Sequence, residues 1–144
     1  MILLDTTILV YALGEEHRLR DPSRRLLELI RDRTVRASTT IEVIQEFCHV
    51  RSRRRPRGEA AARAREYARV LAPLVRFGES ELLLGLELFA TSAGLSPFDA
   101  VLAATARQRG LALASADRAF AEVQGLSHLD PSSPAFLTAA RALG

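Results

Sequence analysis

The chain has 144 residues, of which 48% are hydrophobic and 26% charged, a composition typical of a single globular domain and not of a disordered chain. All 20 basic residues are arginine and the net charge is +3; the lack of lysine disfavours Schiff-base chemistry, Walker-type phosphate loops and receiver-domain phosphorylation. No apolar run approaches the roughly 20 residues that span a membrane, and the lone Cys48 cannot form an internal disulfide, which fits a reducing, cytoplasmic compartment.

The first third of the chain predicts short strands that alternate with helices. The apolar residues 2–4 are typical of a buried strand, and residues 6–13 follow as a short helix. Asp21 and Pro22 mark the next helix start, with Asp21 as the N-cap and Pro22 as the first helical residue. Residues 35–37 are expected to form a second strand.

The rest of the chain continues the same alternation. Thr39 or Thr40 can cap a helix that runs from Ile41 through Val50. Further helices are expected at residues 58–71, 79–93, 97–109 and 132–143, and further strands at residues 73–77, 111–114 and 127–129. Short buried strands separated by helices predict one α/β domain over residues 1–144, a three-layer α/β/α fold with a short parallel central sheet.

Acidic residues fall where the carboxyl ends of these strands are expected. Asp5 ends the first strand, and Asp117 lies just past the strand at residues 111–114. Asp99 lies in the first turn of its helix, and Glu42 and Glu46 share one face of theirs. Because ligands of open parallel sheets bind at the carboxyl ends of the strands, these acids are expected to converge.

Converging carboxylates repel one another unless a cation neutralises them. Oxygen ligands suit Mg²⁺ or Mn²⁺ better than zinc. Such an ion can activate water for attack on a phosphodiester, and a second ion about 4 Å away can stabilise the leaving oxygen. The three histidines, His17, His49 and His128, lack metal-ligand spacing and are expected to be surface or packing residues.

Each acid also has a purely structural interpretation. Asp5 can cap the helix that follows it, and Asp99 can complement the dipole of its own helix. Asp117 can be an ordinary turn residue, and Glu42 and Glu46 can be solvated helix charges.

Four segments that carry the acids resemble the motifs of PIN domains. Residues 2–7 are similar to the family's opening, a hydrophobic strand followed by Asp-Thr and a small polar residue. Residues 40–47 are similar to the second motif, in which a glutamate follows a Ser or Thr by one and a half helical turns. Residues 98–106 resemble the third motif, which is the most specific match, and residues 113–120 the fourth. The order, spacing and length agree over essentially the whole chain.

The resemblance extends to the VapC-type toxins of bacterial toxin–antitoxin pairs. It implies an endoribonuclease that depends on Mg²⁺, or Mn²⁺, a homodimer, and inhibition by a cognate antitoxin whose tail enters the acidic site. It makes Asp5, Glu46, Asp99 and Asp117 the catalytic, metal-binding acids, with Asp5 and Asp99 as direct ligands and the other two bound directly or through water. Glu46 fits the motif spacing better than Glu42, which is left as a supporting acid.

Two hydroxyl residues and a basic cluster complete the expected site. Thr7 and Ser115 are expected to orient the carboxylates, although either can be only a turn or capping residue. The arginines that follow the Glu46 helix are expected to hold the RNA backbone; they are Arg51, Arg53, Arg54 and Arg55. A solvated helix end is the alternative for this cluster, and a genomic preference for arginine codons is the alternative for the lack of lysine.

Other interpretations concern the apolar stripes and the activity itself. The stripes at residues 26–30 and 82–89 are mostly core, but part of either can be a dimer or antitoxin surface.

A catalytically silent PIN-like module that binds RNA or protein is the main alternative function, although such a module would not need four acids. A phosphotransfer enzyme with Asp5 as nucleophile is disfavoured, because Thr7 stands where a second aspartate is usual.

Overall fold

A four-stranded parallel sheet lies at the centre of the molecule. The computed structural model describes residues 1–143, and in it the strands follow the order β2-β1-β3-β4 with every neighbouring pair parallel. The strands are β1 (Ile2–Leu4), β2 (Ala37–Ser38), β3 (Ala112–Ala114) and β4 (Ser127–Leu129). Leu4 pairs with Ala114, so the first and third strands end at the same level. The predicted α/β class with a short parallel sheet is confirmed.

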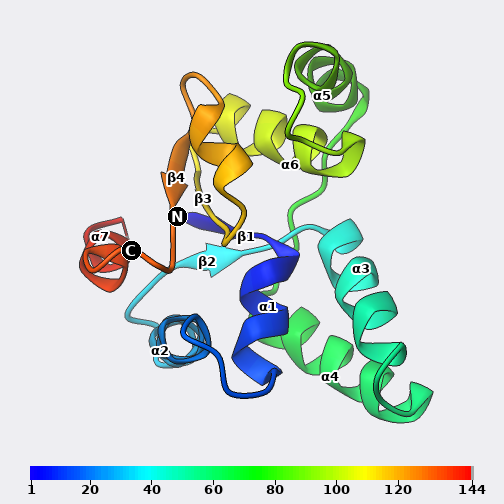
Figure 1. Cartoon of the computed structure of the whole chain (residues 1–144), viewed down its shortest axis with the longest axis vertical. Coiled ribbons are helices and arrows are strands. Elements are labelled where there is room, and N and C mark those ends of the chain that lie inside the picture. Colours follow the sequence, from blue (N-terminus) through cyan, green and yellow to red (C-terminus); the bar gives the residue numbers. More distant parts are fainter. Residues whose placement is uncertain (144) are drawn as a thin grey trace.

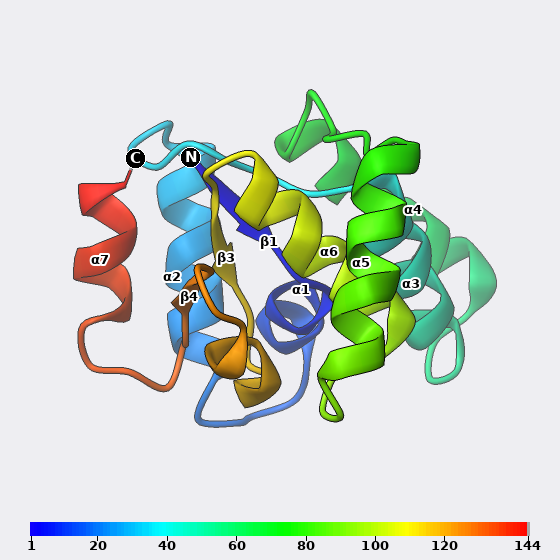
Figure 2. The same ribbon diagram turned by 90° about the horizontal axis from the view of Figure 1, so that it is seen from above.

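Helices cover both sides of this sheet. They are α1 (Thr6–Leu13), α2 (Arg20–Arg31), α3 (Ile41–Ser52), α4 (Arg57–Val70), α5 (Glu79–Thr91), α6 (Pro97–Gln108), the 3-10 helix η1 (Arg118–Glu122) and α7 (Phe136–Ala142). Figure 1 shows α5 and α6 above the strands and α1, α2 and α4 below them. Figure 2 shows α7 beside α2 and α5 beside α6. None of the helices within residues 1–143 has the length and apolar character needed to cross a bilayer.

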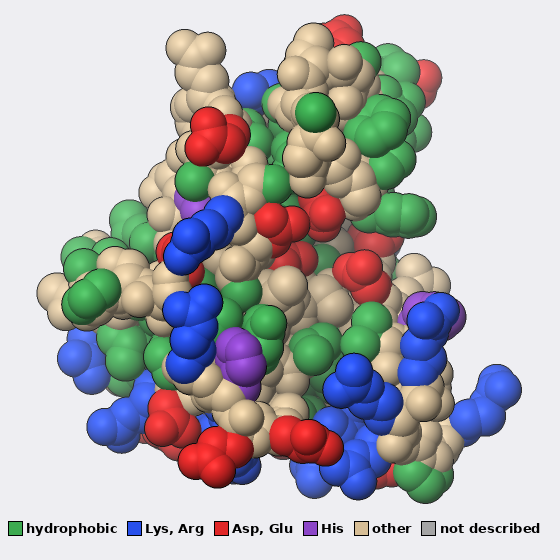
Figure 3. Space-filling model, viewed as in Figure 1, with side chains coloured by type: hydrophobic (Ala, Val, Ile, Leu, Met, Phe, Trp, Pro, Cys, Tyr) green, Lys and Arg blue, Asp and Glu red, His purple; other side chains and the backbone are tan. Residues whose placement is uncertain are grey.

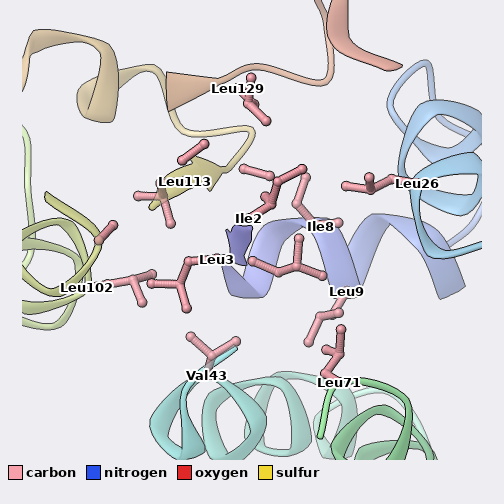
Figure 4. Close-up of a cluster of buried hydrophobic side chains, with 14 of the residues drawn as sticks. Ile2, Leu3, Ile8, Leu9, Leu26, Val43, Leu71, Leu102, Leu113 and Leu129 are labelled. Carbon is pink, nitrogen blue, oxygen red and sulfur yellow. The ribbon is translucent and has the colours of Figure 1, made fainter. Parts of the chain in front are cut away.

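The hydrophobic core forms around β1 and α1. All three residues of β1 are fully buried, as are Ile8 and Leu9 on α1. Figure 4 shows these side chains meeting Leu113 from β3 and residues from the surrounding helices. A central parallel strand is covered on both faces, which explains its continuous apolar sequence. This packing fixes β1 and α1, and with them the residue between them, Asp5.

The start of α2 differs from the prediction. The helix begins at Arg20 with Leu19 as the N-cap, so Asp21 is not the cap and Pro22 lies inside the first turn. The cause lies in the preceding turn, where the Leu19 N–H donates to Nδ1 of His17 at 3.2 Å and Leu19 is buried. Because Leu19 is buried, the helix begins two residues earlier than the Asp-Pro pair predicts.

Two further predicted boundaries and one predicted strand were wrong. The second strand spans Ala37–Ser38 instead of residues 35–37, because the N–H of Val35 donates to the carbonyl of Leu29 at 3.1 Å and so belongs to the turn that ends α2. Residues 73–77 form no strand and contribute one bridge, between Thr40 and Val75. The last helix begins at Phe136 and not at residue 132, because Asp130 accepts the N–H of Ser132 at 2.8 Å and holds a turn there.

The contact between α5 and α6 leaves no room for a side chain at Gly85. A Cβ on Gly85 would lie 2.5 Å from Cγ2 of Val101. We expect Gly85→Ala to lower the free energy of unfolding by about 1–3 kcal/mol, the usual cost of overpacking. Gly58 on α4 is the matched control, since nothing lies within 4 Å of its Cβ position; Gly58→Ala should be neutral or stabilise by up to about 1 kcal/mol. Urea unfolding measures both, and equal values for the two variants would contradict this packing.

Candidate active site

The four predicted acids come from four different elements. Asp5 follows β1 and caps α1, and Asp117 follows β3 and caps η1. Glu46 lies on α3, and Asp99 lies in the first turn of α6. All four line one hollow of about 310 Å³, and Figure 3 shows acidic side chains gathered near the middle of this face. The structure therefore brings residues that are up to 112 positions apart in the chain (117 − 5) to one place.

Asp5 is buried and held by two hydroxyl groups. Its Oδ2 accepts a hydrogen bond from Oγ of Ser115 at 2.6 Å and from Oγ1 of Thr7 at 2.7 Å. The Thr7 hydroxyl also accepts the N–H of Ala116 at 3.0 Å, which links α1 to the end of β3. Within the described residues 1–143, no group donates to Oδ1 of Asp5, so this oxygen is available to a ligand. The two residues expected to orient the carboxylates, Thr7 and Ser115, both contact Asp5.

Two hydroxyl partners of the acids were not predicted from the sequence. Thr6 donates to Oε2 of Glu46 at 2.5 Å, and Ser96 donates to Oδ2 of Asp99 at 2.8 Å. Ser96 was recognisable, because Ser-x-x-Asp before an apolar run marks a helix N-cap. The Thr6 contact had no local signal, since it joins α1 to a helix 40 residues further on.

Asp117 caps the 3-10 helix η1 and also lines the acidic hollow. Its Oδ1 accepts the N–H of Ala119 at 2.9 Å, and its own N–H donates to Oγ of Ser115 at 3.0 Å. His128 donates from Nε2 to the carbonyl oxygen of Ser115 at 2.9 Å, because a carbonyl can only accept, and so supports this turn. The capping interpretation of Asp5 is correct, and Asp117, expected as a turn residue in the structural alternative, caps η1. Neither role competes with the position of these residues in the hollow.

Burial and the neighbouring carboxylates both act on the charge of Asp99. Burial raises the pKa of the Asp99 carboxyl above its ordinary value, the hydrogen bond from Ser96 partly opposes this, and the negative charges of Asp5, Glu46 and Asp117 raise it further. The helix dipole favours a negative charge at this first-turn position. Burial and the neighbouring carboxylates act against this effect of the dipole.

The donors around the hollow are suited to a hard divalent cation. They are carboxylate and hydroxyl oxygens, which Mg²⁺ and Mn²⁺ prefer, and a cation would relieve the repulsion at Asp99. Among residues 1–143, no group of three or more Asp, Glu, His or Cys side chains is arranged so that it could hold a metal ion as it stands. The chemistry of the donors thus fits such an ion, and the hollow offers these donors without a preformed coordination shell.

Glu42 lies outside this hollow. It is exposed and lines a neighbouring apolar groove of about 620 Å³ between α3 and the α5–α6 pair. Asp5, Glu46 and Asp99 border both the groove and the hollow. Glu42 and Glu46 therefore face the same side of α3, but only Glu46 reaches the four-acid hollow.

The predicted arginine cluster divides into two parts. Arg51 binds Glu59 through Nη2 at 2.5 Å and Nε at 3.0 Å, and this contact lowers the pKa of Glu59. Arg51 thus joins α3 to α4 and is not free to bind phosphate. The exposed members line a second hollow of about 790 Å³; they are Arg53, Arg54 and Arg55. This arginine hollow shares Val10, Tyr11 and Val50 with the acidic one, and Figure 3 shows basic side chains below the acidic group.

Comparisons with known proteins agree with this architecture. The family model of the PIN domain matches residues 2–126. The chain is 50% identical over 138 residues to Ribonuclease VapC7 from Mycobacterium tuberculosis, covering 92% of this chain and 93% of that protein. A chain of the crystal structure of VapBC2 from Rickettsia felis bound to a DNA fragment from their promoter superposes with a TM-score of 0.72. That match covers 90% of this chain and 98% of the other at 18% identity, and it shows the fold.

The repulsion at Asp99 predicts a stabilising substitution. In EDTA at neutral pH, Asp99→Asn should raise the thermal midpoint, by on the order of 2 °C. The pKa of Asp99 is raised in the folded state, so its ionised carboxylate destabilises the fold at a pH above the ordinary pKa. At acid pH the carboxyl is protonated in the folded and the unfolded protein. The stability gained by Asp99→Asn should therefore vanish there. Differential scanning calorimetry across pH measures this.

Asp21→Asn is the matched control, since Asp21 is exposed and also lies in a first helical turn. It should lose a little stability, because only the dipole acts on it. A loss of stability in Asp99→Asn as large as that in Asp21→Asn would contradict the repulsion.

Proposed function

The chain belongs to the PIN-domain family, and from this membership we propose that it is an Mg²⁺-dependent endoribonuclease, the toxin of a type II toxin–antitoxin pair. The observation that carries the proposal is the meeting of four carboxylates in one accessible hollow. A purely structural role does not explain four mutually repelling acids. The half-identical relative is named a ribonuclease of the VapC type, which supports RNA as the substrate and the toxin role.

In this proposal Asp5 and Asp99 hold the metal directly, and Glu46 and Asp117 hold it directly or through water. The chemistry that a bound Mg²⁺ would supply is to orient a water for in-line attack on a phosphodiester and to make that water more acidic. Mn²⁺ offers the same chemistry, because an all-oxygen donor set accepts both ions. The hydroxyl groups of Thr7 and Ser115 keep one oxygen of Asp5 engaged, which fixes the orientation of the other.

The arginine hollow supplies the contact to the RNA backbone. Arg53, Arg54 and Arg55 are exposed beside it, and forked guanidinium groups bind phosphate well. Because the arginine hollow adjoins the acidic one, a strand held by these arginines passes next to the four carboxylates. Phosphate contacts position the strand and carry no sequence preference.

A cognate antitoxin and a second copy of the chain are the proposed protein partners. Helix α5 leaves several apolar side chains exposed at its surface; they are Leu82, Leu83, Leu86 and Phe89. Together with Phe98, which is 75% exposed, they form a surface of the kind that protein partners cover. An enzyme that acts on cellular RNA and is held by an antitoxin works in the cytoplasm.

Cleavage of RNA tests the proposal. The purified protein, incubated with total cellular RNA and Mg²⁺ or Mn²⁺, should cut it. EDTA should abolish cutting. Asp99→Asn should reduce the rate by more than about 100-fold, because mutating even a residue that only supports a metal ligand lowers activity by about 10–100-fold. Asp21→Asn is again the control and should cut like the wild type.

Two results would count against the proposal in different ways. Cutting that survives EDTA or Asp99→Asn would mean that the acidic hollow is not the catalytic centre. No cutting with either metal, combined with no metal binding in calorimetry, would favour the catalytically silent PIN-like binding module.

A further inference from the structure

Tyr11 occupies the junction between the acidic hollow and the arginine hollow. It lies near the end of α1 and borders both spaces. Val10 and Val50 also border both hollows, and Tyr11 is the aromatic residue of the three. It is therefore the side chain at this junction on which a nucleotide base could stack.

The ring of Tyr11 is not part of the hydrophobic core. Tyr67, the other tyrosine, is buried and donates its hydroxyl to the carbonyl of Leu9 at 3.2 Å. Tyr11 is half-buried and stands outside the core cluster, and its hydroxyl has no hydrogen-bond partner within the described residues 1–143. Fold stability alone therefore explains Tyr67 well and Tyr11 poorly.

A second ring holds Tyr11 in place. The imidazole of His17 stacks against it, with ring centroids 4.7 Å apart and planes inclined by 24°. The His17 ring is itself oriented by the Leu19 N–H, which donates to its Nδ1 at 3.2 Å. Because both rings are fixed before anything binds, little conformational entropy is lost when a third flat group joins the stack.

We propose that Tyr11, backed by His17, is the platform on which one RNA base stacks beside the cleaved phosphate. This inference rests on the proposed ribonuclease function and adds to it the contact that positions the nucleotide. Aromatic platforms beside a cationic track bind single-stranded nucleic acid in this way, and every base offers a flat face to them. The arginines then hold the backbone, the acids hold the reacting phosphate, and Tyr11 fixes the base between them.

The test places the fluorescent base 2-aminopurine in a short single-stranded RNA of randomised sequence. The protein carries Asp99→Asn, so that the RNA is bound and not cut. Stacking on Tyr11 should quench the fluorescence. Tyr11→Leu should abolish this quenching and weaken binding about tenfold, whereas Tyr11→Phe, which keeps the ring, should retain both. Equal thermal midpoints of the three proteins check that the fold is intact.

A kinetic readout separates this inference from the proposed function. With an RNA that the wild type cuts, Tyr11→Leu should raise KM about tenfold and leave kcat within a few-fold. This pattern is expected when a lost contact stabilised the bound substrate and the transition state equally. Normal cutting with unchanged KM and unchanged quenching in Tyr11→Leu would overturn the platform and leave the ribonuclease standing. Loss of quenching in Tyr11→Phe as well would also overturn it, because the hydroxyl and not the ring would then make the contact. An absence of both RNA binding and cutting in the wild type would overturn both proposals.

Discussion

Four carboxylates that repel one another are held in one hollow, and the rest of the site depends on this constraint. The parallel sheet brings Asp5 and Asp117 together, and helices α3 and α6 add Glu46 and Asp99. Since β1 and β3 end in register, with the Asp5 N–H donating to the carbonyl of Ala114 at 3.0 Å, the residues after both strands must meet at the same edge. Neighbouring hydroxyl groups of Ser115, Thr6 and Ser96 then hold the carboxylates there. Charge-assisted hydrogen bonds of this kind stabilise ionised carboxylates that burial would otherwise disfavour.

Three different surfaces meet around the hollow. An apolar groove borders it between α3 and the α5–α6 pair, an arginine-lined hollow borders it at the end of α3, and the Tyr11–His17 stack lies between acids and arginines. Each surface suits a different chemical group, namely a protein side chain, a phosphate and a nucleobase. Under the proposed function, an RNA strand would reach the acidic centre from the arginine side and a protein partner from the side of the apolar groove.

The elements that the sequence predicted best are those whose local pattern and tertiary role agree. Residues 2–4 and 6–13 are strand and helix as predicted, because the whole strand and one face of the helix, with Ile8, Leu9 and Ala12, enter the core. Asp21 was mistaken for a helix cap because burial of Leu19 overrides the local signal. The pairing of Arg51 with Glu59 was also invisible, since it depends on how α3 packs against α4. Helical periodicity placed Glu42 and Glu46 on one face, and only the tilt of α3 decides which of them enters the hollow. The Tyr11–His17 stack was missed for the same reason, as it needs the path of the turn after α1.

If the four acids form one metal site, as proposed, calorimetric titration of Mn²⁺ and Mg²⁺ will detect it. The wild type should bind the metal, and Asp5→Asn should abolish binding although it keeps the size of the side chain. Ser115→Ala, which removes only the hydroxyl that orients Asp5, should weaken binding by about 10–100-fold, the usual effect of losing such a partner. Metal affinity that is unchanged in Asp5→Asn would contradict the account, because the ion would then be held somewhere other than in the hollow.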